Sequence, residues 1–319
     1  MIVLSNFDGI SCFLQALKNK GIQVDEYFAS EIDEDSIKVS KSNHPEVKHV
    51  GDITLLDGWD FRFITLFLFG SPCQNVSKAG RKLGFRTVCG IKVKSLKQYL
   101  DLKSKGYKFI GESYLFWEAV RLLHEINSYR FILGLEPVRF VMENVGMSEE
   151  WEDVITKALG VKPILINASL LSAQNRERNF WTNIQNVCIP EDKHVYLSDV
   201  IPGAVSGAGV RGRKLKGRLV STNILTKRKD RKANCLTTNG GGITKKTGKP
   251  HGCSLYVDVN GNVIPLTVEQ MEQLQGLPIG YTLGVPKTHR IKMIGNGMSI
   301  PVIEYISGFL VPMYHNHLT

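Results

Sequence analysis

Apolar runs alternate with segments of helical spacing through the first half of the chain, and this alternation limits the possible folds more than any other feature. Strands that alternate with helices predict a parallel sheet with right-handed crossovers. We therefore predict an α/β fold with a mostly parallel sheet. The expected strands are residues 2–6, 24–30, 47–51, 64–69 and 138–142, and the expected helices are residues 10–19, 34–42 and 114–127.

The pattern loosens after about residue 183. Residues 203–217 are rich in Gly, Lys and Arg, and residues 239–252 contain three consecutive glycines and a pair of lysines. We predict a catalytic domain at 1–184, a smaller, irregular module at 185–265 and a C-terminal segment at 266–319. That segment is expected to hold helices at 268–275 and 300–309.

Composition excludes several classes of protein. With 43% apolar residues the chain can bury a sizeable core, and no apolar stretch reaches 18 residues, so no membrane span is expected. The first residues lack the features of a signal peptide. Six cysteines contain no C-x-x-C pair, which predicts neither a zinc site nor a disulfide framework, and we expect no metal and a cytoplasmic location.

The net charge of +10 is unevenly distributed. Residues 193–251 hold 14 Lys or Arg and two acids, and residues 78–108 hold 10 Lys or Arg and one acid. The rest of the chain is acidic. Solvated surface would explain single lysines, but two basic stretches favour a polyanionic partner close to the active site.

A cysteine follows the buried run at 64–69, in Gly70-Ser71-Pro72-Cys73. In open α/β sheets, ligands bind outside the carboxyl ends of the strands, which is where this thiol is expected. Pro72 has a fixed φ and stiffens the approach to Cys73. Cys73 is therefore a candidate nucleophile, with an ordinary buried cysteine as the alternative.

Polar residues at other strand ends indicate a cofactor site. The turn Phe7-Asp8-Gly9-Ile10 opens the first helix, where a ligand can accept backbone amides. Glu31 follows the second strand, where an acid usually binds ribose hydroxyls, and Asp52 follows the third. Each acid could equally cap a helix. A turn with one glycine favours a mononucleoside cofactor over a dinucleotide.

Glu143 follows the strand at 138–142, and Arg176 and Arg178 are two residues apart, so in an extended segment they would point to the same side. A cysteine, a carboxylate and paired arginines suit the addition of a thiolate to an electron-poor ring. A surface salt-bridge cluster is the alternative reading of the arginines.

Taken in order, these motifs resemble those of the cytosine-5 DNA methyltransferase family, with a Rossmann-like catalytic domain. The matching segments span residues 3–305. They are Phe7-Asp8-Gly9, Glu31, Gly51-Asp52, Gly70-Ser71-Pro72-Cys73-Gln74, Glu143-Asn144-Val145, Gln174-x-Arg176-x-Arg178, residues 265–278, and Gly295-Asn296 through Ser299-Ile300-Pro301.

The resemblance implies S-adenosylmethionine as methyl donor and a cytosine flipped out of duplex DNA as substrate. It implies that Cys73 adds to carbon 6 and that Glu143 holds ring nitrogen 3 and the amine. Arg178 would contact the ring carbonyl, and Arg176 would support the thiolate and Glu143. The implied catalytic residues are Pro72, Cys73, Glu143, Gln174, Arg176 and Arg178, and the implied cofactor residues are Phe7, Asp8, Gly9, Ile10, Glu31, Ile32, Asp52, Ile53, Asn296 and Ser299.

Three features depart from the family pattern. Ser11 stands where many members have a second glycine, and residues 92–108 resemble an insertion. Residues 111–116 match the motif that opens the next helix only loosely. The alternatives are the transfer-RNA-methylating branch, a catalytically silent DNA-binding relative and a nucleotide-linked oxidoreductase. The intact Cys73, Glu143, Glu31 and Asp52 disfavour the silent relative. We expect a monomeric, nucleoid-associated enzyme of a bacterium or phage, and leave a cognate restriction endonuclease open.

Overall fold

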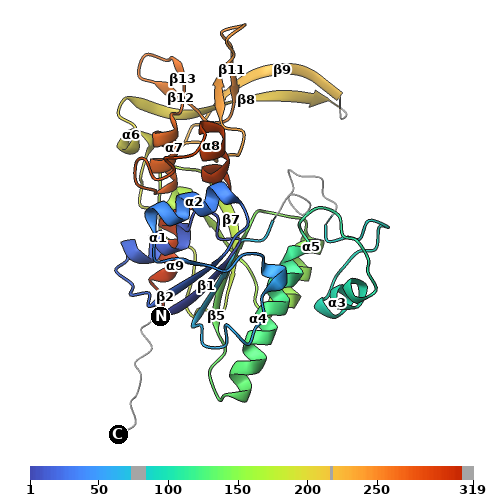
Figure 1. Cartoon of the computed structure of the whole chain (residues 1–319). Helices are drawn as coiled ribbons and strands as arrows, with labels where there is room; N and C mark the ends of the chain where they lie inside the picture. Colours follow the sequence, from blue (N-terminus) through green and yellow to red (C-terminus); the bar gives the residue numbers. More distant parts are fainter. Residues whose placement is uncertain (73–83, 216–217, 311–319) are drawn as a thin grey trace.

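A computed structural model of the chain describes residues 1–72, 84–215 and 218–310, with the backbone alone at 211–215 and 218–224. A central sheet of seven strands has the order β3-β2-β1-β4-β5-β7-β6 (Figure 1). Its first five strands in this order are parallel, and β7 runs antiparallel to both of its neighbours. The strands are β1 (Ile2–Asn6), β2 (Glu26–Ser30), β3 (Lys48–His49), β4 (Leu66–Phe69), β5 (Arg139–Asn144), β6 (Ile164–Asn167) and β7 (Glu177–Thr182). The predicted α/β class with a mostly parallel sheet is confirmed.

Helices cover both faces of this sheet (Figure 1). On one face lie α1 (Cys12–Asn19), α2 (Glu34–Asn43) and α9 (Ile300–Ser307), and on the other lie α4 (Leu115–Ile132) and α5 (Glu149–Leu159). The short helix α3 (Leu96–Ser104) lies beside α4, and the 3₁₀ turns η1 (Ile53–Leu55) and η2 (Ala168–Leu170) follow β3 and β6. Each face has its own apolar core, because parallel strands bury side chains on both sides.

The second half contains an ordered sheet where the sequence predicted an irregular module. Strands β8 (Ala204–Leu215) and β9 (Arg218–Lys227) form a long antiparallel hairpin, joined by β12 (Leu255–Asp258) and β13 (Val263–Pro265). Strands β10 (Gly241–Ile243) and β11 (Pro250–Gly252) form a separate pair, and α6 (Leu197–Val200) precedes β8. The prediction was wrong because a backbone ladder holds this hairpin, with only a small apolar cluster at Ala208, Leu255 and Val257. Glycine and lysine therefore conceal the strand pattern.

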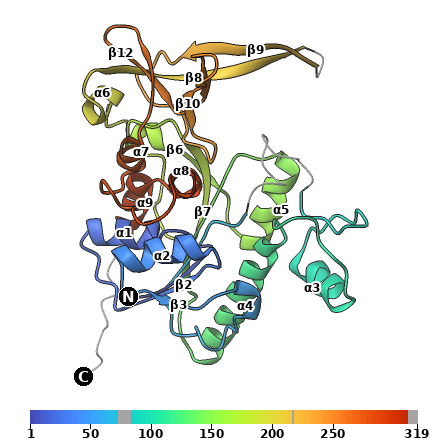
Figure 2. The ribbon, with the colours of Figure 1, turned by 45° about the horizontal axis from the view of Figure 1, so that its top comes forward.

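The C-terminal segment returns to the first sheet (Figure 2). Helices α7 (Val268–Gln275) and α8 (Lys287–Asn296) lie between the two sheets, and α9 packs against α1, where Asn19 donates to Glu304 at 2.6 Å. Helices α7 and α9 were predicted from the sequence, whereas α8 was not, because its charged stretch shows little apolar spacing. Within the described parts of the chain, no helix is both long and apolar enough to cross a membrane.

Candidate active site

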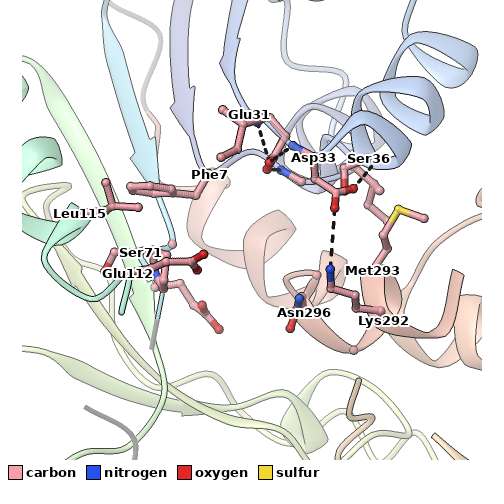
Figure 3. A pocket seen from close by; sticks show the side chains of 18 of the residues that line it. Phe7, Glu31, Asp33, Ser36, Ser71, Glu112, Leu115, Lys292, Met293 and Asn296 are labelled. Carbon is pink, nitrogen blue, oxygen red and sulfur yellow. Dashed lines mark hydrogen bonds and ion pairs between the residues drawn. The ribbon is translucent and has the colours of Figure 1, made fainter. Parts of the chain in front are cut away.

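A cavity of about 700 Å³ opens at the carboxyl ends of β1, β2, β4 and β5 (Figure 3). Open α/β sheets bind ligands at this edge because the strand ends and helix N-termini leave polar backbone groups there. Most predicted site residues line it. They are Phe7, Gly9, Ile10, Glu31, Ile32, Asp52, Ile53, Pro72, Glu143, Arg176, Arg178 and Asn296.

The turn after β1 forms one wall of the cavity, and hydrogen bonds to Asp8 hold the turn in shape. The Asp8 carboxylate accepts hydrogen bonds from Ser11 Oγ and Tyr27 Oη, both at 2.6 Å, and burial raises the pKa of this carboxyl. Ser11 has φ 58°, in the region that favours glycine, and its bond to Asp8 offsets part of that strain. Asp8 is not among the residues that line the cavity, and its contact with the cofactor stays a prediction.

Two carboxylates at neighbouring strand ends face the cavity. Glu31 accepts from the Gly9 amide at 2.8 Å through one oxygen and from the amides of Ile32 and Asp33 at 2.8 and 2.9 Å through the other. Asp52 accepts from the Thr54 amide at 2.8 Å. These bonds fix both acids in the wall, so each presents acceptors to a ligand without further ordering.

The reacting end of the cavity contains an ion pair between Glu143 and Arg178. Arg178 Nε lies 2.9 Å from Glu143 Oε1, and the two side chains are only 16% and 12% exposed, Arg178 first. Asn144, the last residue of β5, donates to the carbonyl of Ser71 at 3.4 Å and connects this strand end to the segment before Pro72. Pro72 lines the cavity, and the predicted nucleophile Cys73 lies outside the described residues.

Arg176 lines the same cavity, but backbone carbonyls hold its guanidinium. It donates to the carbonyls of Leu236, Gly295 and Gly297 at 3.3, 3.2 and 2.8 Å, and burial together with the neighbouring Arg178 lowers its pKa. The Glu143 carboxylate forms its ion pair with Arg178, and the support of the thiolate and Glu143 by Arg176 stays a prediction. Arg176 joins the C-terminal segment to the first domain.

Two further predicted residues are buried and do not line the cavity. Gln174 is fully buried, donates to the carbonyl of Leu274 at 3.0 Å and accepts from the Leu236 amide at 3.1 Å. Ser299 is buried at the start of α9. Neither lines the cavity, so the catalytic role of Gln174 and the cofactor contact of Ser299 stay predictions.

Helices α2 and α8 supply wall residues that sequence reasoning missed. Asp33 caps α2 and lies 3.7 Å from Lys292 of α8, and His289 of α8 pairs with Asp35 (Figure 3 shows the Asp33–Lys292 pair). Glu112 and Leu115 close the cavity from the start of α4. The acidic residues that follow Glu31 in the sequence could have indicated the wall residues of α2, whereas the sequence of α8 gave no such indication. Among the residues that the structure describes, no group of three His, Cys, Asp or Glu could hold a metal.

The fold and the cavity define an α/β enzyme with acidic strand ends around a nucleoside-sized site. The model of the family described as C-5 cytosine-specific DNA methylase matches residues 1–96 and 205–310, well over half of the chain. The chain belongs to this family and is a DNA (cytosine-5)-methyltransferase, which transfers a methyl group from a methyl donor to cytosine in DNA.

Relatives and solved structures agree with this assignment. The Type II methyltransferase M.NlaIV of Neisseria lactamica is 33% identical, over 92% of this chain and 94% of its own length. The Type II methyltransferase M1.ScrFI of Lactococcus lactis subsp. cremoris is 25% identical, over 89% of this chain and 72% of its own length. A DNMT2 mutant of Spodoptera frugiperda has the same fold, with a TM-score of 0.61, 15% identity and coverage of 97% of this chain and 99% of that one.

Proposed function

We propose that S-adenosylmethionine is the methyl donor and binds in the cavity between the turn after β1 and helix α8. A volume of about 700 Å³ suits a ligand of this size. Phe7 offers an aromatic ring to the adenine, Glu31 accepts hydrogen bonds from the ribose hydroxyls, and Asp52 accepts a hydrogen bond from the adenine amine. When bound, the cofactor supplies the methyl group.

Cys73 is the nucleophile of this proposal. Its thiolate forms a bond to carbon 6 of a flipped cytosine, and the electron pair displaced from the 5,6 double bond makes carbon 5 nucleophilic. After carbon 5 accepts the methyl group, its proton leaves to a base, the double bond re-forms and the thiolate departs. One observation carries the assignment: the Glu143–Arg178 ion pair lies in the same cavity as Pro72, the residue next to Cys73.

Glu143 and Arg178 act on the cytosine ring together. A carboxyl at the end of β5 holds ring nitrogen 3 and the exocyclic amine, which offsets the charge that develops when the thiolate adds. Arg178 fixes the Glu143 carboxylate in position and contacts the ring carbonyl. Both side chains are largely withdrawn from water, so these interactions are stronger than they would be at the surface.

Covalent trapping tests the nucleophile. Random-sequence duplexes in which 5-fluorocytosine replaces cytosine should form a complex that survives denaturing electrophoresis, because fluorine blocks the final elimination. Cys73→Ser should abolish both trapping and methyl transfer. Cys89→Ser is the matched control, since Cys89 is an exposed cysteine of the same chain region. Full turnover by Cys73→Ser would reject the mechanism.

Residues 185–265, which include the hairpin β8–β9, form the target-recognition module of this proposal. Relatives named Type II methyltransferases favour a role in a bacterial restriction–modification system, in the cytoplasm with the host DNA. One chain carries every motif, which favours a monomer. Methyl transfer to duplex DNA but not to transfer RNA separates this proposal from the transfer-RNA branch, and sequencing of methylated cytosines identifies the site.

A further inference from the structure

Residues 85–110 form a small folded unit, called here the basic arm, that is joined to the site at both ends. It follows residues 73–83, which include Cys73, and it ends two residues before Glu112, which lines the cavity. In Figures 1 and 2 its helix α3 stands out from the body beside α4. The arm overlaps the insertion that the sequence indicated, and the proposed chemistry gives it no role.

Apolar and backbone contacts hold the arm in one place. Phe85 is buried and lies 5.2 to 5.7 Å, between ring centroids, from Phe116, Trp117 and Trp151. The two ends of the arm pair through backbone bonds, with the Val88 amide donating to the Lys108 carbonyl at 2.8 Å. Tyr99 of α3 donates to the fully buried Glu118 of α4. The arm therefore presents its surface in a fixed position.

That surface is strongly basic. The arm contains seven Lys or Arg and one acid, Asp101. Its nearby carboxylates are already shared: Glu150 pairs with both Lys92 and Lys94, at 2.7 and 2.9 Å. Glu118 pairs with Lys103 and Arg121, and Asp101 pairs with Lys105.

Two exposed cations of the arm have no such partner. Lys97 of α3 and Lys108 are exposed, and within the described residues neither has an ion pair. A fixed, anchored surface with more cations than the neighbouring acids neutralise is complementary to a polyanion.

We propose that the basic arm binds the phosphates of duplex DNA beside the target cytosine, through Lys97 and Lys108, independently of sequence. This proposal rests on the proposed function, and it adds a second DNA contact to the recognition module. Lysine is a compact point charge suited to phosphate, and phosphate contacts set affinity and salt dependence without reading sequence. The arm then holds the duplex beside Glu112, which lines the cavity.

Salt dependence of binding tests the arm. The double variant Lys97→Gln, Lys108→Gln is titrated into a fluorescein-labelled, random-sequence 30-bp duplex at several KCl concentrations, with anisotropy as the readout. The plot of log affinity against log salt should become shallower by about 1.8, since each lost phosphate contact contributes about 0.9. Methylation in sequenced product DNA should fall in amount while the methylated sequence stays the same.

The control is Lys20→Gln, Lys41→Gln. Both lysines are exposed and lie at the C-terminal ends of α1 and α2, helices that begin at the cavity end of the sheet and run away from it. This variant should keep the slope of the unchanged protein. If the arm variant and the control have the same slope, the proposal is wrong. It is also wrong if the arm variant loses affinity for a structured RNA of equal length but not for the duplex.

The test separates failure of the arm from failure of the proposed function. S-adenosylhomocysteine binding by calorimetry should be unchanged in both double variants, which confirms that they are folded. If the unchanged protein methylates duplex DNA and the arm variant keeps its salt slope, only the proposed role of the basic arm is rejected. An unchanged protein that methylates no DNA rejects the proposed function, whatever the slopes.

Discussion

Arg176 and Arg178 are two residues apart, yet their guanidinium groups contact different partners. Arg176 donates to three backbone carbonyls, whereas Arg178 pairs with Glu143. Arg176→Met should lower the free energy of unfolding by about 3 kcal/mol, because buried carbonyls lose a charged donor. Arg178→Met should cost less stability but should slow methyl transfer about 10²- to 10³-fold. Urea unfolding and single-turnover rates measure the two effects, and equal stability losses would contradict this division.

The two strand-end acids lead to a prediction about cofactor affinity. Glu31→Ala and Asp52→Ala should each weaken S-adenosylhomocysteine binding by about 1–3 kcal/mol, since a ligand group loses its acceptor in a partly buried site. Glu26→Ala is the control, because Glu26 lies on β2, the strand that precedes Glu31, and pairs with Lys48 at the surface. Calorimetry measures the affinities, and an unaltered affinity in both pocket variants would misplace the cofactor.

At the scale of elements, residues 231–238 help to join the proposed recognition module to the first domain. The Asn175 amide donates to the Ala233 carbonyl at 2.9 Å, and Lys232 Nζ donates to the Ser169 carbonyl at 2.8 Å. Gln174 and Arg176 bind the backbone of Leu236. Residues 231–238 thus belong structurally to the junction, although they fall inside the predicted module.

An exchange of segments tests where sequence recognition resides. Residues 204–230 and 239–265 should be replaced by their equivalents from a relative with another target, while residues 231–238 are kept. The methylated sequence should change to that of the donor, because base contacts carry the specificity. Sequencing of methylated cytosines reads the result, and a chimera that keeps the original pattern would place recognition outside this module.

At the scale of the whole molecule, a buried histidine connects the C-terminal segment to the first domain. Tyr281 Oη donates to the Ile10 carbonyl at 2.8 Å, so His44 Nε2 donates to Tyr281 at 2.9 Å. His44 Nδ1 then accepts from Lys18 Nζ at 3.0 Å. Burial and the Lys18 charge lower the pKa of His44 to about 4, so this histidine is neutral in the folded protein.

This depressed pKa predicts acid sensitivity. Below the unfolded pKa of about 6.5, the unfolded chain binds a proton that the folded chain does not, so stability falls as the pH falls from about 6.5 to 4. His44 should account for at most about 3 kcal/mol of this loss. His44→Gln should be less stable at pH 7.5 and should lose less on acidification. Urea unfolding between pH 7.5 and 4.5 measures the difference, and parallel curves for the two proteins would refute the link.

The sequence by itself determined the parallel α/β sheet and the strand ends that carry Phe7, Glu31, Asp52 and Glu143. These follow from local patterns, because an apolar run of strand length and the turn after it are set by neighbouring residues. Ordered motifs were enough to indicate the family. The hairpin β8–β9 escaped prediction, since its backbone ladder leaves little apolar pattern to read.

Only the tertiary structure decided which side chains meet. Arg178 forms the ion pair with Glu143, whereas Arg176 does not. Asp8 and Gln174 do not line the cavity, and α8 supplies Lys292 opposite Asp33. These pairings join residues far apart in the chain, and their geometry depends on how the C-terminal segment packs between the two sheets. Local sequence patterns carry no information about such partners, because the same side chain can cap, pair or be buried according to what the fold brings beside it.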